Sequence, residues 1–151
     1  MKIGGVEVSP CEEVTVLPRS DGEDIPFRAK SVSINKEFEA LVPVPIAPMV
    51  QTKGGNKPDY SDKDFKAAVA RRDDQRFAFM CLKSLEPSEI EWVTVDLEKP
   101  GTWLGWQDEL LAEGFSEVEC NRLVNLVMCA NSLDESKIEA ARKRFLQGQG
   151  E

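Results

Sequence analysis

The sequence of 151 residues contains no histidine. This absence removes the commonest general base of enzymes, every His-dependent catalytic triad and every His-ligated metal site. The cysteines are scattered without any CxxC pair, so the ligand spacing of a structural zinc site is also missing. We therefore expect a protein that is not an enzyme and holds no metal ion or other cofactor.

The sequence also lacks an excess of basic residues and any long apolar run. Its net charge is −8 at pH 7, and this charge repels a phosphate backbone, so nucleic acid is excluded as a partner. No apolar stretch is long enough to span a bilayer, and Met1-Lys2 leads into no apolar signal segment. We expect no membrane association and a cytoplasmic location, where Cys81, Cys120 and Cys129 serve as small buried hydrophobic residues.

Aromatic residues make up only 7% of the chain, yet all three tryptophans fall within residues 90–115. One tryptophan can bury about 200 Å² of mainly apolar surface. Trp103, Trp106, Leu110 and Leu111 are spaced to share one face of a helix. An aromatic cage for a ligand is the alternative, but this spacing among leucines favours an internal packing anchor.

The first third of the chain has the composition of β-structure. β-Branched residues with partial alternation predict strands at 2–8, 13–17 and 25–34, separated by Pro and Asp-Gly turns. Such a small antiparallel sheet needs a helix across one face to be stable. Asn35 is expected to be the N-cap of a short helical turn at 36–41.

Residues 42–60 are expected to connect this β unit to the rest of the chain. Prolines alternate with apolar residues over 42–49, which predicts an extended arm, and 51–59 has the composition of a flexible loop. The arm either lies across its own domain, the interpretation that the apolar residues favour, or binds a groove on a partner. Its candidate partner-binding residues are Val44, Ile46 and Met49.

Residues 61–151 have the periodicity of a helical domain. Capping boxes predict helix starts at Ser61 and Ser116, a further helix is expected at 103–113, and Asp134 or Ser132 is expected to cap the last one. The last helix should turn one apolar face inward, made by Ile138, Ala141, Phe145 and Leu146. The expected fold is α+β: an N-terminal antiparallel β unit at 1–41, the Pro-rich crossover at 42–60, and a C-terminal bundle of about four helices.

Two polar clusters in the helical part are candidate partner-binding sites. Arg71, Arg72 and Arg76 lie in the charged middle of the long helix, and Asn121 and Asn125 are one turn apart on a later one. Solvated helix faces give the same patterns, and this alternative stays open. Paired acids at 108–109 and 117–119 could ligate Mg²⁺ or Ca²⁺, but they lack a surrounding EF-hand loop.

A series of landmarks in the C-terminal part resembles tail assembly chaperones of long-tailed bacteriophages. The resemblance extends from about Tyr60 to Gln149 and includes Pro-Gly-Thr-Trp at 100–103 and Trp-Gln-Asp-Glu-Leu at 106–110. The other landmarks are at 82–87, 90–97, 114–119, 130–135 and 145–149.

This resemblance implies a non-enzymatic protein of the host-cell cytoplasm that binds the tape-measure protein, the tail-tube protein or both during tail assembly. Self-association is compatible with such a role. The acidic charge and amphipathic helices are compatible with that role. Two other classes remain: a structural protein of the virion, in the tail or neck, and an acidic inhibitor of a host protein. A structural protein of the virion would be present in purified particles. An acidic inhibitor would bind a basic target with strong salt dependence.

Overall fold

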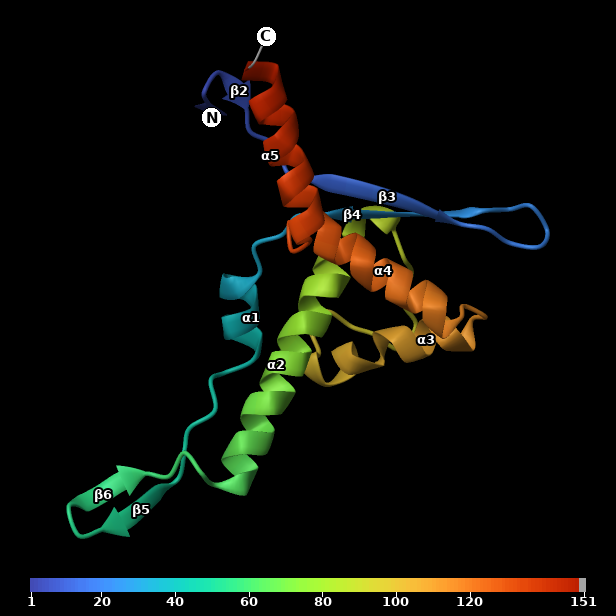
Figure 1. The fold of residues 1–151 in the computed structure, drawn as a ribbon. Coiled ribbons are helices and arrows are strands. Elements are labelled where there is room, and N and C mark those ends of the chain that lie inside the picture. Colours follow the sequence, from blue (N-terminus) through green and yellow to red (C-terminus); the bar gives the residue numbers. More distant parts are fainter. Residues whose placement is uncertain (150–151) are drawn as a thin grey trace.

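The computed structural model describes residues 1–149 and has an α+β fold with three two-stranded antiparallel sheets and five α-helices (Figure 1). The strands are β1 (Lys2–Ile3), β2 (Val6–Glu7), β3 (Glu12–Leu17), β4 (Ile25–Lys30), β5 (Met49–Thr52) and β6 (Gly55–Pro58). The α-helices are α1 (Asn35–Leu41), α2 (Lys63–Ser84), α3 (Trp106–Ala112), α4 (Glu117–Ala130) and α5 (Glu135–Gln149), and the 3₁₀ helices are η1 (Glu86–Ser88) and η2 (Pro100–Gly105).

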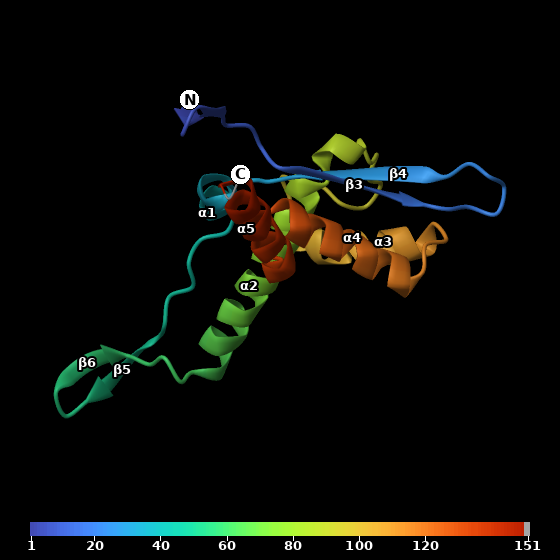
Figure 2. The same cartoon turned by 45° about the horizontal axis from the view of Figure 1, so that its top comes forward.

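The hairpin β3–β4 covers helix α4 and forms one wall of the core. Its register pairs Glu12 with Lys30 at one end and Leu17 with Ile25 at the other. Because side chains alternate along a strand, Phe27 on β4 is buried while Arg28 beside it is exposed. Figure 2 shows the hairpin lying over α3 and α4, so the expected helix across one face of the sheet is present.

The predicted three-stranded N-terminal sheet is wrong. Gly4 and Gly5 have positive φ angles of 58° and 85°, which glycine adopts readily, and they fold the first predicted strand back on itself as the hairpin β1–β2. All residues of its two strands are exposed, Ile3 at 64% and Val6 at 69%. The free edge of β4 is instead covered by η1, where Ser88 Oγ accepts from Arg28 N at 2.8 Å and donates to Arg28 O at 2.7 Å.

The predicted flexible loop at 51–59 is also wrong, because most of it belongs to the hairpin β5–β6. Gly55 has φ 100°, and Thr52 Oγ1 donates to Gly55 O at 2.7 Å across the turn. Only the part of the arm before Met49 has no regular secondary structure. It leads from α1 past α2 to the hairpin, which projects from one end of the molecule (Figure 1).

The three tryptophans differ in their burial. Trp103 is fully buried and stacks on Phe79 of α2, with ring centroids 4.4 Å apart, and its Nε1 donates to Asp96 O at 3.1 Å. Trp106 is buried as well, whereas Trp92 is partly exposed. The predicted packing anchor is therefore confirmed for Trp103 and Trp106, although a 3₁₀ turn precedes α3, which begins only at Trp106.

Of two helix caps predicted from the sequence, one is confirmed and the other lies one residue away from its predicted position. At α4 the capping box is confirmed, because Ser116 Oγ accepts from Glu119 N and Glu119 Oε1 accepts from Ser116 N. At α2 the N-cap is Asp62 rather than Ser61, with its carboxylate accepting from Phe65 N at 2.9 Å. The two candidates are adjacent, so sequence spacing alone separates them poorly.

Buried cysteines fill gaps between the helices. Cys81 and Cys120 are buried, as predicted, and Cys129 is half-buried. Burial raises the pKa of the Cys81 thiol to about 12, so almost no thiolate forms there at neutral pH. Cys81 therefore acts as a packing residue.

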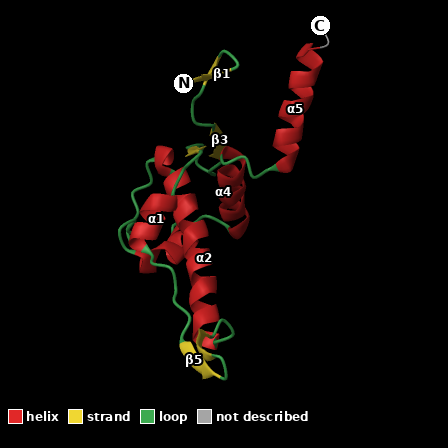
Figure 3. Cartoon of the chain, turned by 90° about the vertical axis from the view of Figure 1, so that its left-hand side faces the viewer, coloured by secondary structure: helices red, strands yellow, loops and turns green. Residues whose placement is uncertain are grey.

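Helix α5 does not join the bundle, and the predicted inward apolar face is wrong. Ile138, Phe145 and Leu146 remain 44%, 63% and 52% exposed, and no residue of α5 is buried within the described chain. Figure 3 shows α5 standing apart from the other helices. Only its first turn is attached to the body, where Lys137 Nζ donates to Cys129 O at 2.9 Å and pairs with Glu13 of β3.

Candidate functional site

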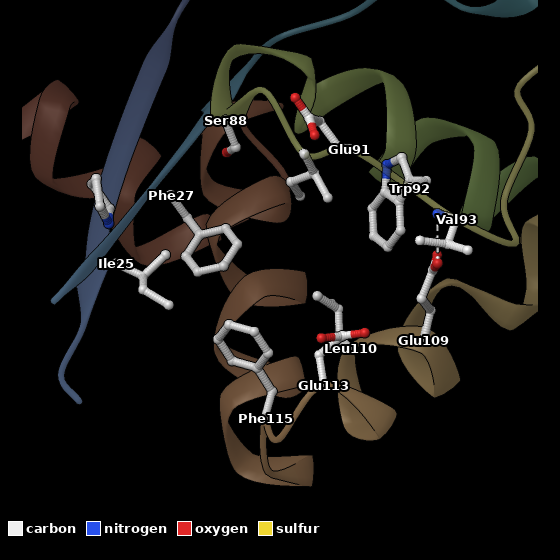
Figure 4. Close-up of a pocket in the computed structure, with 12 residues that line it drawn as sticks. Ile25, Phe27, Ser88, Glu91, Trp92, Val93, Glu109, Leu110, Glu113 and Phe115 are labelled. Atoms are coloured by element: carbon white, nitrogen blue, oxygen red, sulfur yellow. Dashed lines mark hydrogen bonds between the residues drawn. The ribbon is translucent and has the colours of Figure 1, made fainter. Parts of the chain in front are cut away.

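A pocket of about 440 Å³ lies where β4, the segment after η1 and helix α3 meet (Figure 4). Four separate parts of the sequence build it. Its lining residues are Ile25, Pro26 and Phe27 from β4; Ser88, Ile90, Glu91, Trp92 and Val93 from η1 and the following segment; Glu109, Leu110 and Glu113 from α3 and its end; and Phe115.

The pocket floor is apolar and partly aromatic. Phe27 and Phe115 make an edge-to-face contact, with centroids 5.7 Å apart and ring planes at 75°. Gly114 ends α3 with φ 107°, and the following Phe115 N donates back to Leu110 O at 3.1 Å. This turn places Phe115 opposite β4, with Trp92 on another wall (Figure 4).

The pocket lining includes three glutamates and no lysine or arginine. Glu109 Oε1 accepts from the backbone N–H groups of Val93 at 2.6 Å and Thr94 at 2.8 Å, which holds the segment after η1 against α3. The other oxygen, Oε2, is buried and has no hydrogen-bond partner in the described chain. A buried acceptor without a partner is costly, so a ligand that supplies a cation or N–H donor gains from this site.

The predicted arm residues lie away from this pocket. Val44, Ile46 and Met49 are all exposed, Ile46 at 92%. Ile46 also lines a second pocket beside Phe65 and Ala68 of α2. These three residues stay candidate contacts, but on a different surface.

Arg72 and Arg76 attach α1 to α2. Their guanidinium carbons lie 4.9 Å and 5.7 Å from the centroid of the buried Phe38 ring on α1. Arg76 also donates to Asn35 Oδ1. The sequence predicted Asn35 to be the N-cap of this helix. Asn35 is instead the first residue of α1, and the N-cap is Ile34.

The remaining predicted contact residues are exposed and scattered. Arg71 lies on α2, and Asn121 and Asn125 lie on α4. None of the eight predicted partner-binding residues lines the pocket between β4 and α3. Sequence reasoning missed the pocket because no single segment carries its pattern, although the tryptophan-rich stretch supplies much of its wall.

Arg19 supports the pocket from the β3–β4 turn. Its guanidinium carbon lies 4.3 Å from the centroid of the Phe115 ring, and Nη1 pairs with Glu119 Oε2 at 2.8 Å. Glu119 also accepts from Ser116 N at the start of α4. The hydrogen bond from Ser116, followed by that from Arg19, lowers the pKa of Glu119.

The lowered pKa of Glu119 predicts a loss of stability in acid. Below the ordinary glutamate value of 4.5, the unfolded chain binds a proton more readily than the folded one, so stability falls as pH falls through the folded pKa. We expect Glu119→Gln, which keeps a capping side chain, to show a weaker dependence of its urea midpoint on pH below 4.5. An unchanged dependence would contradict the assignment.

Within residues 1–149 no three cysteine or acidic side chains come close enough together to hold a metal ion. No helix in the same range is long and apolar enough to cross a membrane. No protein-family model matches the chain, and no match is found among curated proteins or solved structures.

Proposed function

We propose that this protein is a non-enzymatic assembly chaperone that binds an apolar helical segment of a partner protein. The observation that carries the proposal is the pocket between β4 and α3, with its apolar floor and three lining glutamates. Grooves of this kind take the apolar face of an amphipathic helix. The net charge of −8 opposes aggregation while such apolar surface is exposed.

The proposed partner class rests on the landmarks that resemble those of phage tail assembly chaperones. Several of those landmarks, at 90–97, 106–110 and 114–119, include residues that form the walls of this pocket. We therefore propose the tape-measure protein, a tail-tube subunit or both as partner, bound in the host-cell cytoplasm during tail assembly. The pocket would shield apolar helical segments of this partner until the tube forms around them.

Co-expression with the tape-measure protein of the same genome tests the proposal. We expect a complex in pull-downs and a larger soluble fraction of the tape-measure protein. Trp92→Ala should lower this fraction at least several-fold, because Trp92 forms a wall of the pocket.

The matched control is Val118→Ala, which shortens an apolar side chain on α4 that is exposed and does not line the pocket. This variant should behave like the wild type. Absence of any complex, or of any gain in solubility, would overturn the proposed function. Equal activity of the Trp92 and Val118 variants would overturn the assignment of the pocket.

A further inference from the structure

Helix α5 carries an apolar face that the rest of the described chain leaves uncovered. Ile138, Ala141, Phe145 and Leu146 are spaced i, i+3, i+7 and i+8, and all four are exposed. An isolated helix of this length is marginally stable in water, so covering this face would stabilise it.

The charge of α5 is opposite to that of the whole protein. It contains four basic and two acidic side chains, whereas the chain has a net charge of −8. Arg142 lies on the apolar face itself, since it follows Ile138 by four residues and precedes Leu146 by four. Its only ion pair in the described chain is a solvent-exposed one with Glu139 at 3.7 Å.

These properties are complementary to the pocket between β4 and α3. The pocket offers an apolar floor, two exposed glutamates, Glu91 and Glu113, and the buried Glu109 Oε2 that lacks a donor. An arginine in the middle of an apolar helix face can pair with the exposed glutamates while the apolar side chains around it cover the pocket floor.

The pocket cannot be filled by α5 of the same chain in this arrangement. Phe115 of the pocket precedes α4 and α5 follows it, and the 14 residues of α4 separate these ends by about 20 Å. From there α5 extends away from α3, which contributes to the pocket wall (Figure 1). An α5 helix that fills this pocket must therefore come from a second copy.

We propose that α5 of one copy docks into the pocket of a second copy, with its apolar face on the pocket floor and Arg142 paired with the exposed Glu91 and Glu113. Reciprocal exchange between two copies closes a dimer, and repeated head-to-tail exchange gives a larger assembly. Only the role of this contact rests on the proposed function: α5 covers the pocket until a client helix displaces it.

Sedimentation velocity of the purified full-length protein tests the contact directly. The wild type should have a mass of at least twice the 16.9 kDa of one chain. Arg142→Glu should weaken self-association at least about tenfold, since it replaces a positive charge by a negative one that the pocket glutamates repel. Lys143→Glu makes the same charge change outside the apolar face and should leave self-association unchanged.

Mixing two defective variants provides a second test. Arg142→Glu keeps an intact pocket, and the double variant Glu91→Lys with Glu113→Lys keeps an intact α5. Each should associate with itself at least about tenfold more weakly than the wild type does, but titrating one against the other should restore binding, because each supplies the half that the other lacks. A monomeric wild type, undiminished self-association of either variant, or no binding on mixing would overturn this inference.

Co-expression of the Arg142→Glu variant with the tape-measure protein separates the two proposals. This variant should solubilise the client at least as well as the wild type, because its pocket is free. Self-association without client binding would overturn the proposed function alone, whereas client binding by a monomeric wild type would overturn the docking of α5 alone.

Discussion

The Trp103→Ala variant is expected to lose about 3–5 kcal/mol of the free energy of unfolding. Trp103 is fully buried and stacks on Phe79, and its ring centroid lies 6.1 Å from that of Phe38. Removing its side chain therefore leaves a cavity where α1, α2 and η2 meet. The loss is a large fraction of the roughly 5–15 kcal/mol that stabilises an ordinary domain. Urea unfolding followed by circular dichroism measures it.

Two further variants separate the sources of this effect. Trp103→Phe keeps an aromatic ring but removes the N–H that donates to Asp96 O, so it should lose less than the alanine variant. Trp92→Ala should also lose less, because Trp92 is partly exposed at the pocket. A smaller loss for Trp103→Ala than for Trp92→Ala would contradict the assignment of Trp103 as the anchor.

The Asn131→Ala variant is expected to lose about 1–3 kcal/mol, because the partly buried Val32 N–H loses its partner, whereas Val127 O keeps the backbone N–H of residue 131 at 3.0 Å. Asn131 Oδ1 accepts from Val32 N at 3.0 Å, and Nδ2 donates to Val127 O at 2.8 Å and to Ser84 Oγ at 3.2 Å. Ser84, itself fully buried, donates to Lys30 O at 2.6 Å. Asn131 thus joins the ends of β4, α2 and α4.

The matched control is Asn121→Ala, which removes an exposed asparagine from α4 and should change stability by less than about 0.5 kcal/mol. Hydrogen exchange gives a local readout, since the Val32 amide should lose protection in Asn131→Ala. Equal stability of the two variants in urea unfolding would show that the hydrogen bonds of Asn131 do not stabilise the fold.

The elements were predicted best where their signals are local. The capping box at Ser116 and the long helix that ends at Ser84 depend on residues within one or two turns, and both were found. Which side of α2 is buried does not follow from local signals. Phe77 is 42% exposed, while the adjacent Ala78 and Phe79 are buried, because the positions of α1 and η2 decide which face is covered.

The pocket could not be predicted because its chemistry depends on distant residues meeting. Phe27 and Phe115 are 88 positions apart in the chain and touch only after β4 packs beside the end of α3. The unpaired state of Glu109 Oε2 is likewise a result of packing. Oε1 of the same carboxylate accepts hydrogen bonds from Val93 N and Thr94 N, whereas no donor of the described chain reaches Oε2. Neither feature has a motif.

The sequence alone determined the α+β class, the acidic charge and the tryptophan-rich packing anchor, because composition, helical period and turn residues act over a few neighbouring positions. Only the tertiary structure decided that the N-terminal strands form separate hairpins and that an apolar pocket lined with glutamates opens beside the anchor. It also decided that the apolar face of α5 stays uncovered. An amphipathic pattern shows that a helix has a face to bury, but which surface covers that face depends on where the chain places the helix.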